Sequence, residues 1–451
     1  MLKLSKKIII IGLSAGLFWS LTAENAGNKL SNQSQIQSAT CSRISPIPGV
    51  KRIPAAIPEG FKELPYIESS KLPEFLPVEN SRGFMFFNRS ITQAVYRNSI
   101  PLESERISSV AAFATPGEIE PLTFSIYPLR DIQNMKINVS ELRCGNKVIP
   151  LENLDLRLVT EWPIRYPMYN TKNTFRWLPE LLEQVTSNSF KRGECQRYWL
   201  KVKVPVDARQ GLYTGCLSIT DNAGEKRTQL PIGFRVLGYA LQSDPAKRYS
   251  AYFHLNKNVF YGTTGETLNK FMRNEFIAMQ EYGLNLFPVI PLSSEHGKGK
   301  DLEISIRWPG LQAVDMMIKM GFKGPIPIEG GIVGFYKKHV PNGKINGHWI
   351  VSKLPENDEM FNEIERAFRK FRLECEAKKW PELICCPLDE VDASCATFSA
   401  KIYAAIRRAG IKTYITKDPT ALDAAEYRKY DAIDVWCSQP FSMSYNQVTS
   451  E

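Results

Sequence analysis

The sequence has few histidines and no cysteine or histidine pair at a metal-binding spacing. It contains 4 histidines and 9 cysteines among 451 residues. No two cysteines stand at the C-x-x-C spacing that is typical of zinc and redox sites. His296, His339 and His348 share no metal-ligand spacing either. We therefore expect no metal site, and we expect most cysteines to be buried thiols that pack as small hydrophobic residues.

The sequence also lacks a block of basic residues. Lys and Arg number 57 against 47 Asp and Glu, which gives a formal net charge of +10. This excess is spread along the chain, whereas a nucleic-acid-binding surface is typically a clustered basic stripe. We therefore expect no nucleic-acid partner.

After the first 23 residues the sequence has no long apolar run. Residues 8–19 are largely apolar and follow Lys3, Lys6 and Lys7, a pattern typical of a secretory signal peptide. An uncleaved anchor is the alternative, but the stretch is shorter than the roughly 20 residues that a membrane-spanning helix needs. We predict a signal peptide at residues 1–23 and a secreted or periplasmic protein, with no stable membrane insertion after cleavage.

Short alternating stretches follow a proline-rich segment. Residues 24–80 are rich in proline and serine, which favours a lead-in or linker. Between residues 81 and 241, apolar and polar residues alternate in a way typical of half-buried antiparallel strands. The clearest stretches are 122–126, 200–204, 213–219 and 230–236. We predict a β-sandwich domain at residues 81–241, with one helical insert near residues 178–182.

From residue 242 onward, short apolar runs alternate with helical periodicity. Six runs are predicted as strands: 251–254, 284–290, 325–328, 383–388, 411–415 and 432–437. Strands that alternate with helices indicate parallel βα units, and a series of such units indicates a (β/α)8 barrel. The predicted fold class is a multidomain β plus α/β protein. Its (β/α)8-type barrel at residues 242–451 is expected to be incomplete, with about six βα units.

Two adjacent carboxylates, Asp389 and Glu390, directly follow the apolar run 383–388. In barrel enzymes the catalytic groups lie at the carboxyl ends of the strands. Capping of the next helix is the alternative role, but Asp392 and Ser394 are available for it. We therefore interpret Asp389 and Glu390 as candidate catalytic residues.

Three stretches of the sandwich region are distinctive. They are residues 117–124 (GEIEPLTF), 196–200 (QRYWL) and 204–215, which begins with Val204-Pro205 and ends with GLYTG. With a leader before them and an Asp-Glu pair after the fourth predicted barrel strand, these stretches resemble glycoside hydrolase family 123 and its uncharacterised relatives. The resemblance covers about residues 100–440.

The resemblance implies a glycan substrate and a β-N-acetylgalactosaminidase that needs no cofactor. In such substrate-assisted retaining enzymes, the 2-acetamido oxygen of the sugar attacks the anomeric carbon, and no second protein carboxylate serves as nucleophile. Glu390 would be the general acid and then the base. Asp389 would accept a hydrogen bond from the acetamido N–H and stabilise the charged intermediate.

Residues at other strand ends are candidates for substrate binding. Trp436 and Tyr414 stand in the sixth and fifth predicted strands, and each could contact the sugar or pack in the core. Tyr252 and His254 stand in the first predicted strand, where His254 could donate to a sugar hydroxyl. Glu329 is a weaker candidate, because the following Gly330-Gly331 favours a surface turn.

Two other interpretations stay open. The chain could be a non-catalytic glycan-binding protein whose sandwich recognises carbohydrate. It could also be a truncated, inactive fragment of a hydrolase, because the predicted barrel lacks strands seven and eight, which normally help to close the sugar pocket. The sequence does not indicate the oligomeric state or the disulfide pairing.

Overall fold

A computed structural model describes most of the chain. It covers residues 8–11, 18–22, 57–167, 172–184, 187–220, 227–242, 244, 247–251, 265–296, 301–307, 309–345, 351–391, 393–416 and 431–438. The chain divides into two compact units: the first contains residues 51–242, and the second contains residues 243–451 together with the strands at residues 8–22. Each unit is described by itself.

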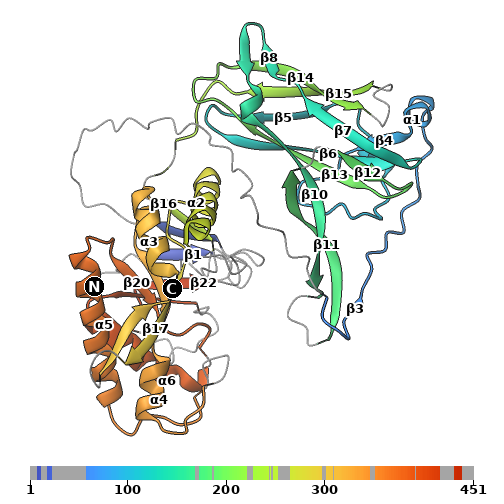
Figure 1. Ribbon diagram of the computed structural model, residues 1–451. Helices are drawn as coiled ribbons and strands as arrows, with labels where there is room; N and C mark the ends of the chain where they lie inside the picture. Colours follow the sequence, from blue (N-terminus) through green and yellow to red (C-terminus); the bar gives the residue numbers. More distant parts are fainter. Residues whose placement is uncertain are drawn as a thin grey trace, which may run out of the picture. The chain divides into compact units, whose positions relative to one another are not determined.

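The first unit consists of two β-sheets (Figure 1). One sheet has the strand order β3-β11-β10-β13-β6-β4 and the other has the order β12-β7-β14-β15-β5, with β8 and β9 attached to β14. The bounds are β3 (Lys62–Glu63), β4 (Phe84–Phe87), β5 (Val110–Ala114), β6 (Ile119–Pro128), β7 (Ile132–Val139), β8 (Leu142–Cys144), β9 (Lys147–Ile149), β10 (Leu154–Arg165), β11 (Thr174–Gln184), β12 (Asn188–Phe190), β13 (Gln196–Lys203), β14 (Gly211–Thr220) and β15 (Arg227–Val236). Short helical segments are α1 (Pro77–Arg82), η1 (Glu103–Glu105) and η2 (Leu151–Asn153).

Side chains from both sheets meet in one hydrophobic cluster. Phe124, Tyr198 and Leu200 come from β6 and β13, and Leu217 and Phe234 come from β14 and β15. All of them are almost fully buried. The four alternating stretches that we predicted as strands are therefore confirmed as strands, each with one face in the core.

The helix predicted near residues 178–182 is wrong, because this segment lies within β11. Leu178 pairs with Trp162 of β10, and Leu181 pairs with Thr160. Pro179 stands opposite Glu161 at a register shift, where the ladder tolerates a residue without an N–H. Cross-strand pairing with β10 therefore overrides the helical spacing of the leucines.

The second unit is built on a mixed sheet with the order β1-β22-β21-β20-β19-β17-β18. All neighbours run parallel except β17 and β18, which are antiparallel. A separate pair joins β16 to β2. The strand bounds are β1 (Ile8–Ile11), β2 (Phe18–Thr22), β16 (Lys247–Ala251), β17 (Ile290–His296), β18 (Leu302–Ile306), β19 (Ile326–Gly330), β20 (Leu383–Cys386), β21 (Lys412–Ile415) and β22 (Val435–Ser438). The helices are α2 (Gly265–Glu281), α3 (Gly310–Lys319), α4 (Val333–His339), α5 (Glu359–Ala377), η3 (Ala393–Cys395) and α6 (Ala396–Arg408).

The (β/α)8 barrel is not confirmed. In the part of the chain that the structure describes, the sheet order begins at β1 and ends at β18, and the β17–β18 hairpin makes one edge antiparallel. The run predicted as a strand at 284–290 is instead a buried loop that leads into β17, which begins at Ile290. Four later predicted strands match β19, β20, β21 and β22. β1 and β2 fall within the expected signal peptide, which stays a prediction.

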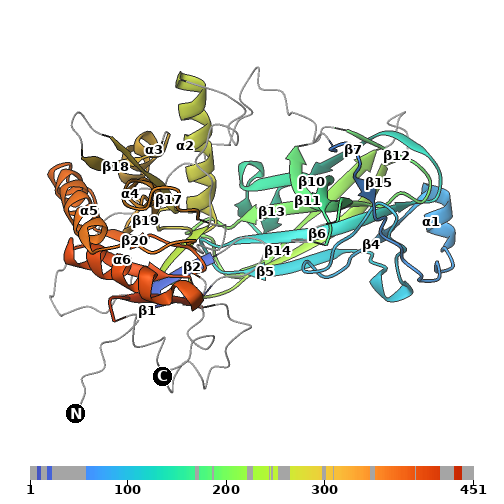
Figure 2. The same cartoon turned by 90° about the horizontal axis from the view of Figure 1, so that it is seen from below.

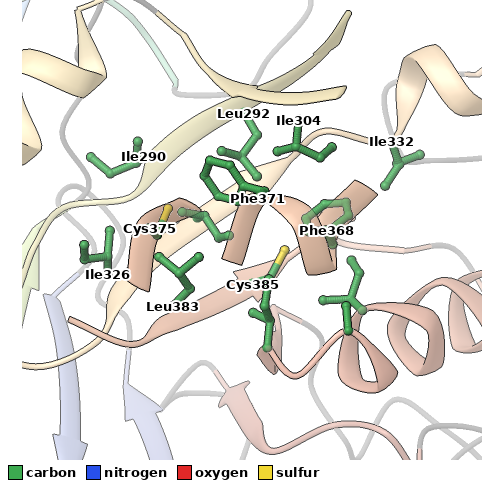
Figure 3. Packing of buried hydrophobic residues seen from close by; sticks show 14 of the residues in the cluster. Ile290, Leu292, Ile304, Ile326, Ile332, Phe368, Phe371, Cys375, Leu383 and Cys385 are labelled. Carbon is green, nitrogen blue, oxygen red and sulfur yellow. The ribbon is translucent and has the colours of Figure 1, made fainter. Parts of the chain in front are cut away.

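Helices α2 to α6 all contribute to one hydrophobic cluster on one face of the sheet. Figures 1 and 2 both show α4, α5 and α6 beside the sheet. Phe368 and Phe371 of α5 pack near Ile326, Leu383 and Cys385 of the central strands (Figure 3). The opposite face carries a smaller cluster that includes Ile384, Cys386, Tyr414 and Val435. The two faces are therefore distinct, and the described helices α2 to α6 cover the first.

Two further findings concern the described residues as a whole. No helix among them is long and apolar enough to cross a membrane. The eight cysteines that the structure describes are free thiols, and five of them are buried. The expectation that most cysteines pack as small hydrophobic residues is confirmed for this part of the chain.

Candidate active site

Asp389 and Glu390 lie just beyond the carboxyl end of β20, at the edge where the parallel strands β19 to β22 all end. The residues on either side of the pair, Leu388 and Val391, are 1% and 2% exposed. Asp389 itself is half-buried and Glu390 is exposed. Because its two flanking residues are anchored in the core, the acidic pair is held at the strand edge.

One hydroxyl group links the two acidic residues. The Thr416 side chain donates from Oγ1 to Asp389 Oδ1 at 2.5 Å. The same Oγ1 accepts from the backbone N–H of Glu390 at 3.0 Å. Thr416 directly follows β21, the neighbour of β20 in the sheet. Its hydroxyl therefore fixes the orientation of the Asp389 carboxylate and the path of the chain at Glu390.

The backbone of Glu390 is in the left-handed region, with φ +46°. A residue other than glycine is uncommon there and costs about 1 kcal/mol or more. Such a conformation persists when the surroundings hold it, here through Thr416 and the buried Val391. It turns the Glu390 side chain out of the direction that continued strand geometry would give it.

Helix capping does not account for the pair. Helix α6 begins after Cys395, and this N-cap position has no side-chain hydrogen bond to the helix. Neither Asp389 nor Glu390 is therefore its cap. Asp392, the other cap that we considered, lies outside the described residues, and Ser394 bonds to the Cys395 thiol.

Tyr414 lies on the sheet face opposite the helices, near the edge that carries the acidic pair. Tyr414 is 1% exposed, and burial raises its pKa well above the usual value, as do the nearby Cys386 and Glu329. Burial also raises the pKa of the Cys386 thiol, with Glu329 and Asp389 adding to the effect. Both carboxylates therefore lie close enough to act on one thiol, which brings Glu329 into the site.

Burial likewise raises the pKa of the Cys437 thiol well above its usual value, and Cys386 and Asp389 contribute. Cys437 follows Trp436 in β22, so the two side chains point to opposite faces of the sheet. The end of β22 therefore reaches the candidate site through Cys437.

Trp436 packs on the helix face instead. It is 7% exposed and lies in a cluster with Tyr403 and Ala396 of α6 and Ile415 of β21. The structure thus gives Trp436 the surroundings of a core residue, which was the alternative role that its position in a strand allowed. We do not include it in the proposed site.

The remaining predicted site residues divide into two groups. Tyr252 and His254 lie outside the described residues. Tyr414 lies on the same face as Cys386, but its burial leaves little of the ring for a ligand to contact. The structure thus brings together Asp389, Glu390 and Tyr414 among the predicted residues.

Sequence reasoning missed Thr416 and undervalued Glu329. Both residues stand at the carboxyl ends of strands that neighbour β20, because β19 pairs with β20 on one side and β21 pairs with it on the other. A signal was available in the sequence, since each is a polar residue at the end of a short apolar run. Only the strand order shows that these two runs flank the one that ends in the acidic pair.

Comparison with known proteins gives an informative structural match. No family model and no curated protein matches the sequence. A family 123 glycoside hydrolase from Clostridium perfringens, solved in a study of glycolipid glycan hydrolysis, aligns with a TM-score of 0.58 and 14% identity over 76% of this chain. The chain spans 64% of the length of that structure. The CooA pilin subunit of Escherichia coli aligns with a TM-score of only 0.20 and 10% identity, over 35% of this chain and 99% of its own, and supports no conclusion. The first match shows that this chain has a fold similar to that of a family 123 glycoside hydrolase.

Proposed function

We propose that this protein is an exported glycoside hydrolase that removes β-linked N-acetylgalactosamine by a substrate-assisted retaining mechanism. The observation that carries the proposal is the acidic pair at the carboxyl edge of the parallel strands, held by Thr416. The fold similarity to a family 123 hydrolase adds support. The sequence stretches that resemble this family point in the same direction.

Glu390 is the proposed general acid and base. It is exposed at the strand edge, where a glycosidic oxygen can approach it. In the first step its carboxyl group gives a proton to the departing oxygen, while the acetamido oxygen of the sugar bonds to the anomeric carbon. In the second step its carboxylate takes a proton from water, which attacks the same carbon and reopens the ring of the intermediate.

Asp389 is the proposed partner of the acetamido group. Its Oδ1 is already engaged by the Thr416 hydroxyl, so Oδ2 is the oxygen that would accept the acetamido N–H. The carboxylate then faces the positive charge that develops as the acetamido oxygen attacks. A fixed charge aimed at developing charge is among the strongest catalytic effects, because it needs no rearrangement during the reaction.

Turnover of an aryl N-acetyl-β-galactosaminide tests the assignment of Glu390. Glu390→Gln keeps the shape of the side chain but removes its acid and base functions, so kcat should fall by at least about 100-fold. Glu382→Gln is the matched control, since Glu382 is exposed at the amino end of the same strand and pairs with Lys412. Equal turnover by wild type and Glu390→Gln would remove Glu390 from the mechanism.

The role of Asp389 has its own test. Substrates with mono-, di- and trifluoroacetamido groups have progressively weaker acetamido nucleophiles, so wild-type kcat should fall along the series. Asp389→Asn should lower kcat on the parent substrate, because the amide lacks the charge that stabilises the intermediate. A flat response of the wild-type enzyme to fluorination would contradict participation of the acetamido group.

A glycan-binding protein without catalysis is the second candidate. It is favoured by a cavity in the sandwich unit with aromatic and polar lining. The absence of any hydrolysis, together with retained glycan binding, would favour this second candidate.

A further inference from the structure

The sandwich unit contains a cavity of about 430 Å³, separate from the residues of the Asp389–Glu390 edge. This volume is within the range of roughly 300–1,000 Å³ that is typical of small-molecule sites. Three aromatic residues line it: Tyr66, Tyr96 and Trp177. Asn98 and Glu161 add an amide and a carboxylate. Aromatic rings beside polar groups that can hydrogen-bond hydroxyls are the chemistry that recognises a sugar ring.

The aromatic wall is held in place. Tyr66 and Tyr96 stack with ring centroids 3.9 Å apart and an interplanar angle of 14°. The Asn98 side-chain amide donates to the backbone carbonyl of Tyr66. The Tyr66 hydroxyl donates to Glu68 Oε2 at 3.3 Å. Both segments that supply tyrosines are thus tied together before any ligand arrives.

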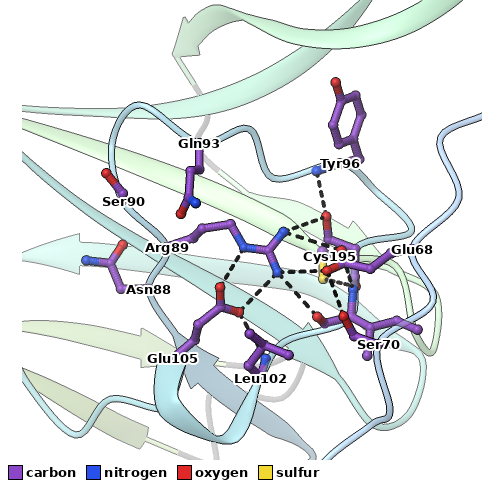
Figure 4. Close-up of polar contacts among 12 residues, drawn as sticks. Glu68, Ser70, Asn88, Arg89, Ser90, Gln93, Tyr96, Leu102, Glu105 and Cys195 are labelled. Carbon is purple, nitrogen blue, oxygen red and sulfur yellow. Dashed lines mark hydrogen bonds and ion pairs between the residues drawn. The ribbon is translucent and has the colours of Figure 1, made fainter.

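A buried ionic network holds the segments that carry this aromatic wall (Figure 4). Arg89 donates to Glu105 through Nε and Nη2, at 2.7 and 3.0 Å. It also contacts both carboxylate oxygens of Glu68 at 3.3 Å. Glu68 in turn accepts from the backbone N–H of Ile100 at 3.1 Å. The network therefore connects the segment around Tyr66 with the segment that follows Tyr96.

A second, smaller cavity of about 140 Å³ shares two lining residues with the first, Arg97 and Glu161. Arg197 and Thr160 also line it. Arg197 is 5% exposed, and its Nε has no hydrogen-bond partner among the described residues. A buried cationic donor with unused hydrogen-bonding capacity therefore lies at this polar cavity, which is rare in proteins.

The other contacts of Arg197 leave its charge without a carboxylate among the described residues. Its terminal nitrogens donate to the backbone carbonyls of Gln93 and Arg89, at 2.6 and 2.9 Å, and to Thr123 Oγ1 at 3.0 Å. All of these acceptors are neutral. A ligand carboxylate could accept from Arg197 Nε, and it would supply the missing negative charge.

We propose that the sandwich unit binds a carboxylated sugar, a uronic or sialic acid residue of a glycan, with its ring against Trp177 and the tyrosine pair and its carboxylate toward Arg197. The Arg97–Glu161 ion pair, which lines both cavities, is the element that has to give way. The Arg97 side chain is 61% exposed and joins the largely buried Glu161 at 3.2 Å, so Arg97 is the partner that can turn into solvent.

Binding of the full-length protein to an array of oligosaccharides that end in glucuronic or sialic acid, with the matched neutral sugars, tests the proposal. We expect at least one acidic sugar to bind at least tenfold more tightly than its neutral counterpart. Trp177→Ala should weaken that binding at least tenfold. Arg197→Lys, which keeps the positive charge but lacks the Nε donor, should reduce the preference for the acidic sugar severalfold.

Two control variants establish whether binding depends on these cavities. Tyr239→Ala removes an exposed tyrosine of the same unit that lines neither cavity, and it should bind as wild type does. Glu382→Gln, in the other unit and outside the proposed catalytic pair, should also bind as wild type does. Binding of no acidic sugar, equal binding of neutral sugars, binding unaffected by both Trp177→Ala and Arg197→Lys, or loss of binding in Glu382→Gln would each overturn the proposal.

Discussion

The hydroxyl of Thr416 should matter for catalysis far more than its position outside the acidic pair suggests. Thr416→Val removes the 2.5 Å hydrogen bond to Asp389 and the 3.0 Å bond from the Glu390 N–H, while keeping the volume of the side chain. Asp389 would then lose its fixed orientation. Glu390, with φ +46°, would lose one contact that holds it in the left-handed region.

The magnitude follows from these two bonds. A hydrogen bond to a charged group contributes about 1.5–3 kcal/mol. Asp389 is half-buried, so the lower end of this range applies, and about 1.5 kcal/mol corresponds to about a tenfold change in rate. Without the bond to Thr416, the Glu390 backbone could also leave its strained conformation, and this relief would favour unproductive conformations by about 1 kcal/mol. We therefore expect kcat to fall about 10- to 70-fold, with a smaller change in KM.

The assay is steady-state turnover of an aryl N-acetyl-β-galactosaminide by wild type, Thr416→Val and Thr416→Ser. Serine keeps the hydroxyl and should retain most of the activity. A Thr416→Val enzyme with wild-type kcat would refute the reasoning, because the hydroxyl would then have no part in placing the pair. A Thr416→Ser enzyme as impaired as Thr416→Val would refute it too, since the methyl group would then be what matters.

Three further predictions concern stability. Phe368→Ala should lower the free energy of unfolding by about 4 kcal/mol, because Phe368 is fully buried in the hydrophobic cluster to which α2 to α6 contribute. Leu373 is on the same helix but 52% exposed, so Leu373→Ala should have little effect in the same urea titration. Arg89→Lys should destabilise the sandwich unit by about 3 kcal/mol, since lysine cannot replace the paired bonds to Glu105 and the contacts to Glu68; thermal unfolding unchanged by this substitution would contradict the network. Glu363 is a buried acid whose pKa burial alone would raise, but hydrogen bonds from His339 and Lys338 outweigh burial and hold the pKa below its usual value. Its stabilising effect is therefore complete above the unfolded pKa of about 4.3 and is lost as the pH falls through the folded value. Glu363→Gln should therefore cost about 2 kcal/mol at pH 7 and progressively less as the pH falls below about 4.3, and a cost that does not change with pH would be the contrary result.

The sequence predicts strands well wherever one face of a strand is buried and the other is polar. For example, Leu200 and Val202 lie on the core side of β13, and Val204 directly follows the strand. All three are buried. Apolar and polar residues alternate in such strands because successive side chains face the core and the polar side in turn. The segment around Pro179 was predicted wrongly because its environment comes from β10, a partner that local spacing does not reveal.

The site was predictable in part for the same reason. Asp389 and Glu390 could be found because acidic residues that end an apolar run stand out locally. Thr416 lies 26 residues after Glu390 and becomes part of the site only through the pairing of β20 with β21. Trp436 shows the converse case: its position in a strand suggested a sugar contact, but the parity of β22 turns it toward α6. The sequence also did not reveal that the described sheet ends at the antiparallel β17–β18 hairpin, because the pairing of these two strands is not visible in local spacing.

The central claim is that Glu390 protonates the departing glycosidic oxygen. The most direct measurement is the dependence of kcat on the leaving group, for wild type and Glu390→Gln, over a series of aryl and alkyl N-acetyl-β-galactosaminides. If Glu390 is the acid, the variant should keep much of its activity on highly activated aryl groups, which leave without a proton, and lose at least about 100-fold on alkyl groups. A uniform loss across the series, or no loss at all, would contradict the account.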